Sequence, residues 1–116
     1  MLIGKTTLKN GASEQKEISY KVDPYVIDEL KLDKTKVDEL FKYAATEAKS
    51  SLKNPLSFDF LPVTEQTGFM YSMPSDSTIK VSVEYIGQNG FGVKAKNTAI
   101  IQYDKKTLQL KDKMFM

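Results

Sequence analysis

Apolar and polar residues along the chain follow two periods, one typical of a helix and one typical of strands. Thr35 with Asp38 resembles a capping box, and Asn54-Pro55 is expected to end the helix that follows the cap. Within residues 36–52, apolar side chains recur at helical spacing along one stripe, namely at Val37, Leu40, Phe41, Ala44, Ala48 and Leu52. The pattern predicts one long helix over 36–52 that packs against a sheet.

From residue 57 onward, the apolar residues alternate with polar ones, as in strands with one buried face. The clearest case is "TIKVSVEYI", in which Ile79 and Val81 share one face and Lys80 and Ser82 the other. A shorter apolar run, "GFMYSM", precedes it. The later strands are expected at 78–86, 92–103 and 107–114, joined by short loops into an antiparallel meander.

The first 22 residues favour a β-hairpin, with Asn10-Gly11 taking the positive φ angles of a tight turn. Asp23 and Pro24 then suit the cap and the first position of a short helical turn. The predicted fold class is α+β: one main helix on an antiparallel β-meander, with an N-terminal β-hairpin, in a single domain over 1–116. This predicted arrangement resembles the cystatin-like and NTF2-like folds.

The chain lacks several residue types on which enzyme active sites and metal sites commonly depend. The chain has no Cys and no His, and all 17 of its basic residues are lysines. Thiolate nucleophiles, the usual general base near neutral pH and the bidentate guanidinium fork are therefore absent. A net charge of +2 gives only weak attraction to polyanions. We predict no enzyme activity, no cofactor, no metal site and no specific nucleic-acid binding.

The start of the chain, "MLIGKTTLKNG", lacks the basic and apolar regions of a signal peptide. No apolar run approaches the length of about 18–20 residues that a membrane-spanning helix needs. We therefore expect no transmembrane segment in this chain.

The stretch "IGQNGFGVKAK" has the glycine spacing of a nucleotide-binding loop only in part, because Ala95 occupies the position of the third glycine. A tight turn explains it better: Asn89-Gly90 and Gly92 would let strand 78–86 fold back on strand 92–103. Phe91, at the tip of this turn, is either packed on the sheet or offered to a partner.

Five lysines fall on the outward phase of the predicted strands: Lys80, Lys94, Lys96, Lys111 and Lys113. If those strands are neighbours, the lysines converge on one open sheet face. That face is either a solvated surface or a docking patch for an anionic surface or an acidic partner. Residues 23–47 hold seven of the 15 acidic residues, so this charge asymmetry is also compatible with a homo-oligomer.

The residues Gln88-Asn89-Gly90-Phe91-Gly92 resemble the Gln-x-Val-x-Gly hairpin of the cystatin family, with Gly90 in place of the Val. The resemblance implies a small inhibitor of a protease or other host enzyme that binds through the 88–92 tip. The tryptophan hairpin of that family is absent, because the chain has no Trp.

A second resemblance covers residues 52–103. "LKNPLSFDF" followed by "VEYIGQNGFG" and an Ala- and Thr-rich strand resembles a small domain of bacterial, often Gram-positive, surface lipoproteins and secreted proteins. It implies an extracytoplasmic module without a catalytic site, although the lipobox Cys of a lipoprotein is absent. The leading hypothesis is a non-enzymatic interaction module of a bacterial surface, secreted or mobile-element protein that binds an unknown protein or anionic partner. A cytoplasmic location is the alternative.

An enzyme could still be built from Asp and Tyr, as in isomerases of the ketosteroid type. Asp59, Tyr71, Tyr85 and Tyr103 are the candidate residues. That hypothesis requires the four side chains to meet in one apolar cavity between helix and sheet.

Overall fold

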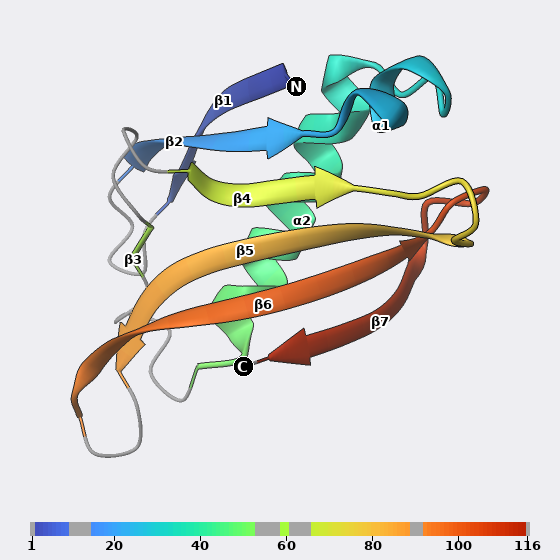
Figure 1. Ribbon diagram of the computed structural model, residues 1–116. Helices are drawn as coiled ribbons and strands as arrows, with labels where there is room; N and C mark the ends of the chain where they lie inside the picture. Colours follow the sequence, from blue (N-terminus) through green and yellow to red (C-terminus); the bar gives the residue numbers. More distant parts are fainter. Residues whose placement is uncertain (1, 10–14, 53–58, 61–65, 89–91, 116) are drawn as a thin grey trace.

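The computed structural model describes residues 2–9, 15–52, 59–60, 66–88 and 92–115. It confirms the α+β class: one long helix covers one face of a single sheet (Figure 1). The helices are α1 (Pro24–Asp28) and α2 (Lys34–Ser50). The strands are β1 (Leu2–Lys9), β2 (Gln15–Val22), β3 (Asp59–Phe60), β4 (Gln66–Tyr71), β5 (Thr78–Gln88), β6 (Lys94–Asp104) and β7 (Leu110–Phe115).

The strands of the sheet lie in the order β1-β2-β4-β5-β6-β7, with β3 also paired to β5. The strands from β4 to β7 pair antiparallel, as the meander predicts, but β2 and β4 are parallel. This parallel junction joins the N-terminal hairpin to the meander, and the alternation of apolar residues does not indicate it. Between β2 and β4 the chain passes through both helices, and such a crossover lets two neighbouring strands run in the same direction.

Helix α2 begins two residues before the predicted position, because Asp33 rather than Thr35 is its N-cap. The Asp33 carboxylate accepts a hydrogen bond of 2.8 Å from the backbone N–H of Lys36. The helix ends at Ser50, and the Ser51 hydroxyl donates to the carbonyl of Ala48 at 2.6 Å. The expected stop at Asn54-Pro55 lies outside the described residues.

The first helical turn and the N-terminal hairpin are confirmed. Asp23 caps α1 by accepting from the N–H of Tyr25, and Pro24 occupies the first turn. Strands β1 and β2 pair antiparallel, whereas their turn at Asn10-Gly11 lies outside the described residues. At the β5–β6 turn, Asn89-Gly90 is likewise outside them, while Gly92 has the expected positive φ of 77°.

The core forms between α2 and the inward residues of the strands, and Figure 1 shows α2 crossing behind them. Phe41 on α2 is fully buried and stacks on Tyr20 of β2 with ring centroids 4.5 Å apart. Tyr103 of β6 donates a hydrogen bond of 2.7 Å to the carbonyl of Leu40. The helix is thus held close to the sheet by ring packing and by a hydrogen bond to its backbone.

Gly68 on β4 allows this close approach. A Cβ at this position would lie 2.2 Å from Phe41 Cε2 and 3.0 Å from the backbone oxygen of Ser82. We expect Gly68→Ala to lower the free energy of unfolding by about 1–3 kcal/mol, because the ring has to move within a packed core. Urea unfolding followed by circular dichroism measures the change.

Gly87→Ala is the matched control, since its added Cβ would meet only the side chain of Leu52, at 2.7 Å. Leu52 is partly buried and can shift, so this variant should lose less stability. Equal losses in the two variants would contradict the role of Gly68 in seating Phe41.

Candidate functional site

The five predicted lysines do not form one patch. Lys80, Lys94 and Lys96 do share the face of the sheet that α2 leaves open. However, Lys80 lies opposite Gln102 and Lys96 opposite Ile86, which places them six residues apart along β5. At strand spacing that is about 20 Å, too far for one small anionic group to contact both.

Lys113 lies on the other face of the sheet, so its predicted position was wrong. It pairs with Ile101, a buried residue facing α2, and its Nζ lies 3.0 Å from Glu47 Oε2 on the helix. The cause is a register shift between Gln102 and Tyr103 that inserts one extra residue into β7. Because of the extra residue, every later residue of β7 lies on the face opposite to the one that alternation predicts. Alternation counted from the sequence does not detect this shift.

Carboxylates compensate much of the remaining lysine charge. Lys80 Nζ lies 4.0 Å from Asp76, and Lys96 Nζ lies 3.4 Å from Glu84. On the helix side, the hydrogen bond from Lys113 lowers the pKa of Glu47. The positive charge of the open face is therefore mixed with negative charge, and the surface is not a concentrated anion site.

The predicted hairpin tip is described only in part. Gln88 is the last residue of β5 and pairs with Lys94. Asn89 and Phe91 lie outside the described residues, so the inhibitor hypothesis for the 88–92 tip stays a prediction.

The four residues of the isomerase hypothesis are not brought together. Tyr85 and Tyr103 are buried on the helix side of the sheet, whereas Tyr71 lies on the open side. Asp59 pairs with Ile86, whose side chain belongs to the open face of β5. The Tyr103 hydroxyl is already engaged by the carbonyl of Leu40.

The open face instead contains a trough that the sequence did not predict. Pairing across β4, β5 and β6 aligns Phe69, Ser82 and Ile100 in one row. The small Ser82 lies between these two large apolar neighbours, inside an open hollow of about 710 Å³ that extends from Lys21 on β2 to Ile100 on β6. Tyr71 extends the β4 wall, with its ring centroid 5.1 Å from that of Phe69.

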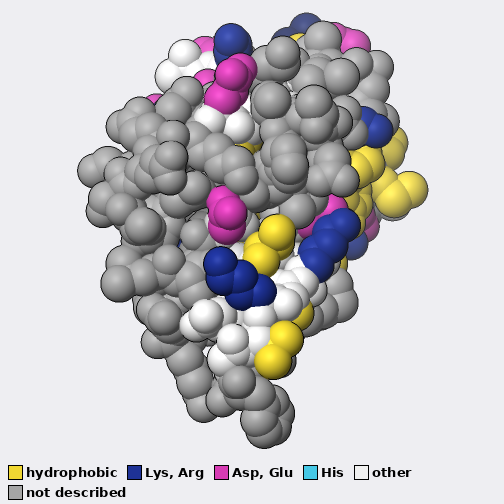
Figure 2. All heavy atoms as spheres, turned by 90° about the vertical axis from the view of Figure 1, so that its left-hand side faces the viewer, with side chains coloured by type: hydrophobic (Ala, Val, Ile, Leu, Met, Phe, Trp, Pro, Cys, Tyr) yellow, Lys and Arg dark blue, Asp and Glu magenta, His cyan; other side chains and the backbone are white. Residues whose placement is uncertain are grey.

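The rim of the trough is polar. Lys21 and Asp23 lie on the β2 side, and Glu84 lies along β5. Figure 2 views the sheet from the left-hand side of Figure 1 and shows hydrophobic side chains gathered at the right, beside lysine and acidic side chains. Apolar walls with a charged rim resemble the apolar centre and polar rim of protein–protein interfaces.

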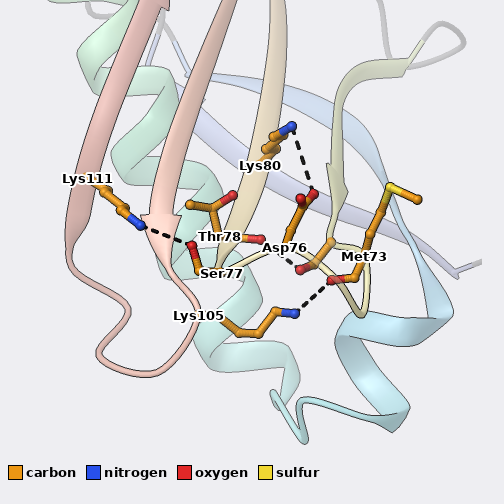
Figure 3. Close-up of polar contacts among 8 residues, drawn as sticks. Met73, Asp76, Ser77, Thr78, Lys80, Lys105 and Lys111 are labelled. Atoms are coloured by element: carbon orange, nitrogen blue, oxygen red, sulfur yellow. Dashed lines mark hydrogen bonds and ion pairs between the residues drawn. The ribbon is translucent and has the colours of Figure 1, made fainter.

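Met73 closes one end of the trough and is 56% exposed. The turn that carries it is anchored by hydrogen bonds from Lys105 and Lys111 and by one bond between its own two ends (Figure 3). Lys105 donates to the carbonyl of Met73 at 2.8 Å, Lys111 donates to the Ser77 hydroxyl at 3.1 Å, and the Ser72 hydroxyl donates to the carbonyl of Thr78 at 2.8 Å. The exposed thioether is thus attached to a fixed backbone.

The sequence contains a signal for the trough that alternation alone obscures. In "GFMYSM" and "AIIQY", apolar residues occupy both phases of a strand. Met70 and Ile101 are buried in the core, so Phe69 and Ile100 necessarily point to the opposite face. Strands with two apolar faces are expected where both sides of a sheet contact something.

Within the described part of the chain, no helix is both long and apolar enough to cross a membrane. Among the same residues, no three His, Cys, Asp or Glu side chains form a group that could hold a metal ion.

Comparisons of the chain with known protein families, with curated proteins and with solved structures found no match.

Proposed function

We propose that the protein is a non-enzymatic interaction module of a bacterial surface, secreted or mobile-element protein, and that its trough receives an apolar side chain of a partner protein. The observation that carries the proposal is the hollow between Phe69 and Ile100 on the sheet face that α2 leaves open. Apolar anchors seated in such hollows contribute much of the affinity of protein complexes.

The distribution of charge favours a protein partner over an anionic polymer. Lys80 and Lys96 each have a carboxylate within 4.0 Å, and they lie six residues apart on the sheet. An anionic polymer would require an uncompensated row of cations. A protein surface needs only an apolar anchor and mixed charges around it, which is what the trough and its rim supply.

Selection of a random peptide library on the immobilised chain tests this function. We expect the selected peptides to share a large apolar residue and to lose at least about tenfold in affinity for the Ser82→Leu variant, because the leucine occupies the space between Phe69 and Ile100 that the apolar residue would enter. Fluorescence anisotropy with a labelled peptide measures the affinity.

Thr98→Leu is the matched control, because it adds the same side chain to the same face, outside the residues that line the trough. It should leave the affinity unchanged. Peptides that bind Ser82→Leu as tightly as the original chain would show that the trough is not the binding site.

The proposed extracytoplasmic location of the protein is tested separately. The resemblance of "LKNPLSFDF" and "VEYIGQNGFG" to surface domains supports an extracytoplasmic position. Antibodies against the chain should then label intact cells of the organism that makes it. Labelling only after lysis would refute the location but would not bear on the trough.

A further inference from the structure

Strand β7 is the edge of the sheet beside β6 and is weakly held. All of its residues are exposed, including Leu110 at 39% and Phe115 at 40%. The neighbouring β6, in contrast, contributes Ala99, Ile101 and Tyr103 to the core. Because β7 buries little apolar surface of its own, opening of this strand is expected to require less free energy than unfolding of the core.

The loop that leads into β7 contains a strained residue. Leu108 has a φ of 62°, in the left-handed region where glycine is favoured and a leucine is disfavoured. Asp104 holds this loop closed: its carboxylate accepts hydrogen bonds from the N–H groups of Lys106 at 2.8 Å and Thr107 at 2.9 Å. Its carbonyl accepts a further bond of 2.8 Å from the N–H of Leu108.

We propose that two copies of the chain exchange β7, so that β7 of each copy pairs with β6 of the other and residues 105–109 form an extended hinge. The exchanged pairing reproduces every contact between β6 and β7 and the ion pair of Lys113 with Glu47. It also allows Leu108 to leave its unfavourable conformation. Strained short hinges next to a separable element are the feature that favours such exchange.

Charge along β7 disfavours the simpler dimer, in which two β7 edges pair side by side. Twofold antiparallel pairing keeps residues of one face opposite residues of the same face. Centring that pairing on Lys111, Asp112 or Lys113 places two identical charges directly opposite each other. Opposed like charges destabilise strand pairs, whereas exchange of β7 brings no such charges together.

A disulfide reports directly on which copy supplies the strand. The chain has no Cys, and Ile100 and Met114 are opposite each other in the β6–β7 register. The doubly substituted chain, Ile100→Cys with Met114→Cys, is separated by size-exclusion chromatography over a range of concentrations. The monomer and dimer fractions are oxidised with copper phenanthroline and run on a non-reducing gel.

We expect a dimer fraction that grows with concentration, and a covalent dimer on the gel from that fraction only. A dimer fraction whose disulfide lies within one chain would overturn the exchange. A chain that remains monomeric up to about millimolar concentration, including after refolding, would overturn it as well.

The hinge itself is tested by Asp104→Ala, which removes the two side-chain hydrogen bonds that close the loop. We expect this substitution to raise the amount of dimer about fivefold for each of the two hinges in the dimer, the size of effect typical of losing a capping carboxylate. Asp104→Asn keeps an accepting oxygen and should behave like the original chain. Asp33→Ala removes the cap of α2, away from the hinge, and should not raise the dimer fraction. An equal increase in the Asp33 and Asp104 variants would refute the hinge.

Discussion

Replacement of Phe41 by alanine is expected to lower the free energy of unfolding by about 3–5 kcal/mol, the range for removing a buried aromatic ring from a core. The Phe41 ring is fully buried, stacks on Tyr20 and fills the space that Gly68 leaves open. Its loss leaves a cavity at the centre of the contact between α2 and the sheet. Chemical denaturation with urea, followed by circular dichroism, measures the change.

Tyr43→Ala on the same helix is the control. Tyr43 is 45% exposed, and the centroid of its ring lies 6.2 Å from that of Tyr103, farther than the 4.5 Å between Phe41 and Tyr20. Its loss should therefore cost about 1 kcal/mol or less. If Phe41→Ala were no more destabilising than Tyr43→Ala, α2 would not be packed on the sheet as described.

The parts of the fold that the sequence predicts are those with a strong period. The stripe on α2 and the alternation in β5 each place one apolar face on the core, and those faces are buried. The parallel pairing of β2 with β4 was not predictable from these patterns. Alternation tells which face of a strand is buried, but it does not tell which strand is its neighbour or in which direction that neighbour runs.

The candidate site was less predictable than the fold, for two physical reasons. The extra residue in β7 changes the phase of the strand, which moved Lys113 to the helix side. The trough arises because Phe69, Ser82 and Ile100 come from three different strands and meet only through their pairing register. A hollow depends on the relative sizes of cross-strand neighbours, and these become known only once the register is known.

Trough and strand β7 are adjacent in the sheet, which links the proposed binding function to the proposed exchange. Ile100 forms one wall of the trough and pairs with Met114 of β7, whose side chain is 49% exposed on the same face. In an exchanged dimer, this neighbour of the wall would come from the second copy. A partner bound in the trough would then lie beside both chains of the dimer.

The stability of the protein is expected to fall steeply above about pH 10. Burial raises the pKa of the Tyr20 hydroxyl, which also donates a hydrogen bond to Asp38, and burial likewise raises the pKa of Tyr103. Both hydroxyls therefore stay protonated in the folded chain at pH values at which an unfolded tyrosine, with its ordinary pKa of 10.0, has ionised.

Above pH 10 the folded state therefore binds more protons than the unfolded state. The contribution of the two protonated hydroxyls to the free energy of unfolding is fully present below pH 10 and is lost as the pH rises. The slope is at most about 1.4 kcal/mol per pH unit for each tyrosine, or about 2.7 kcal/mol for both. Urea midpoints measured from pH 8 to pH 11.5 give this slope. Tyr20→Phe and Tyr103→Phe should each remove about half of it, although each lowers stability at neutral pH by about 1 kcal/mol through a lost hydrogen bond. An unchanged slope in the doubly substituted chain would show that these two buried hydroxyls do not control the alkaline transition.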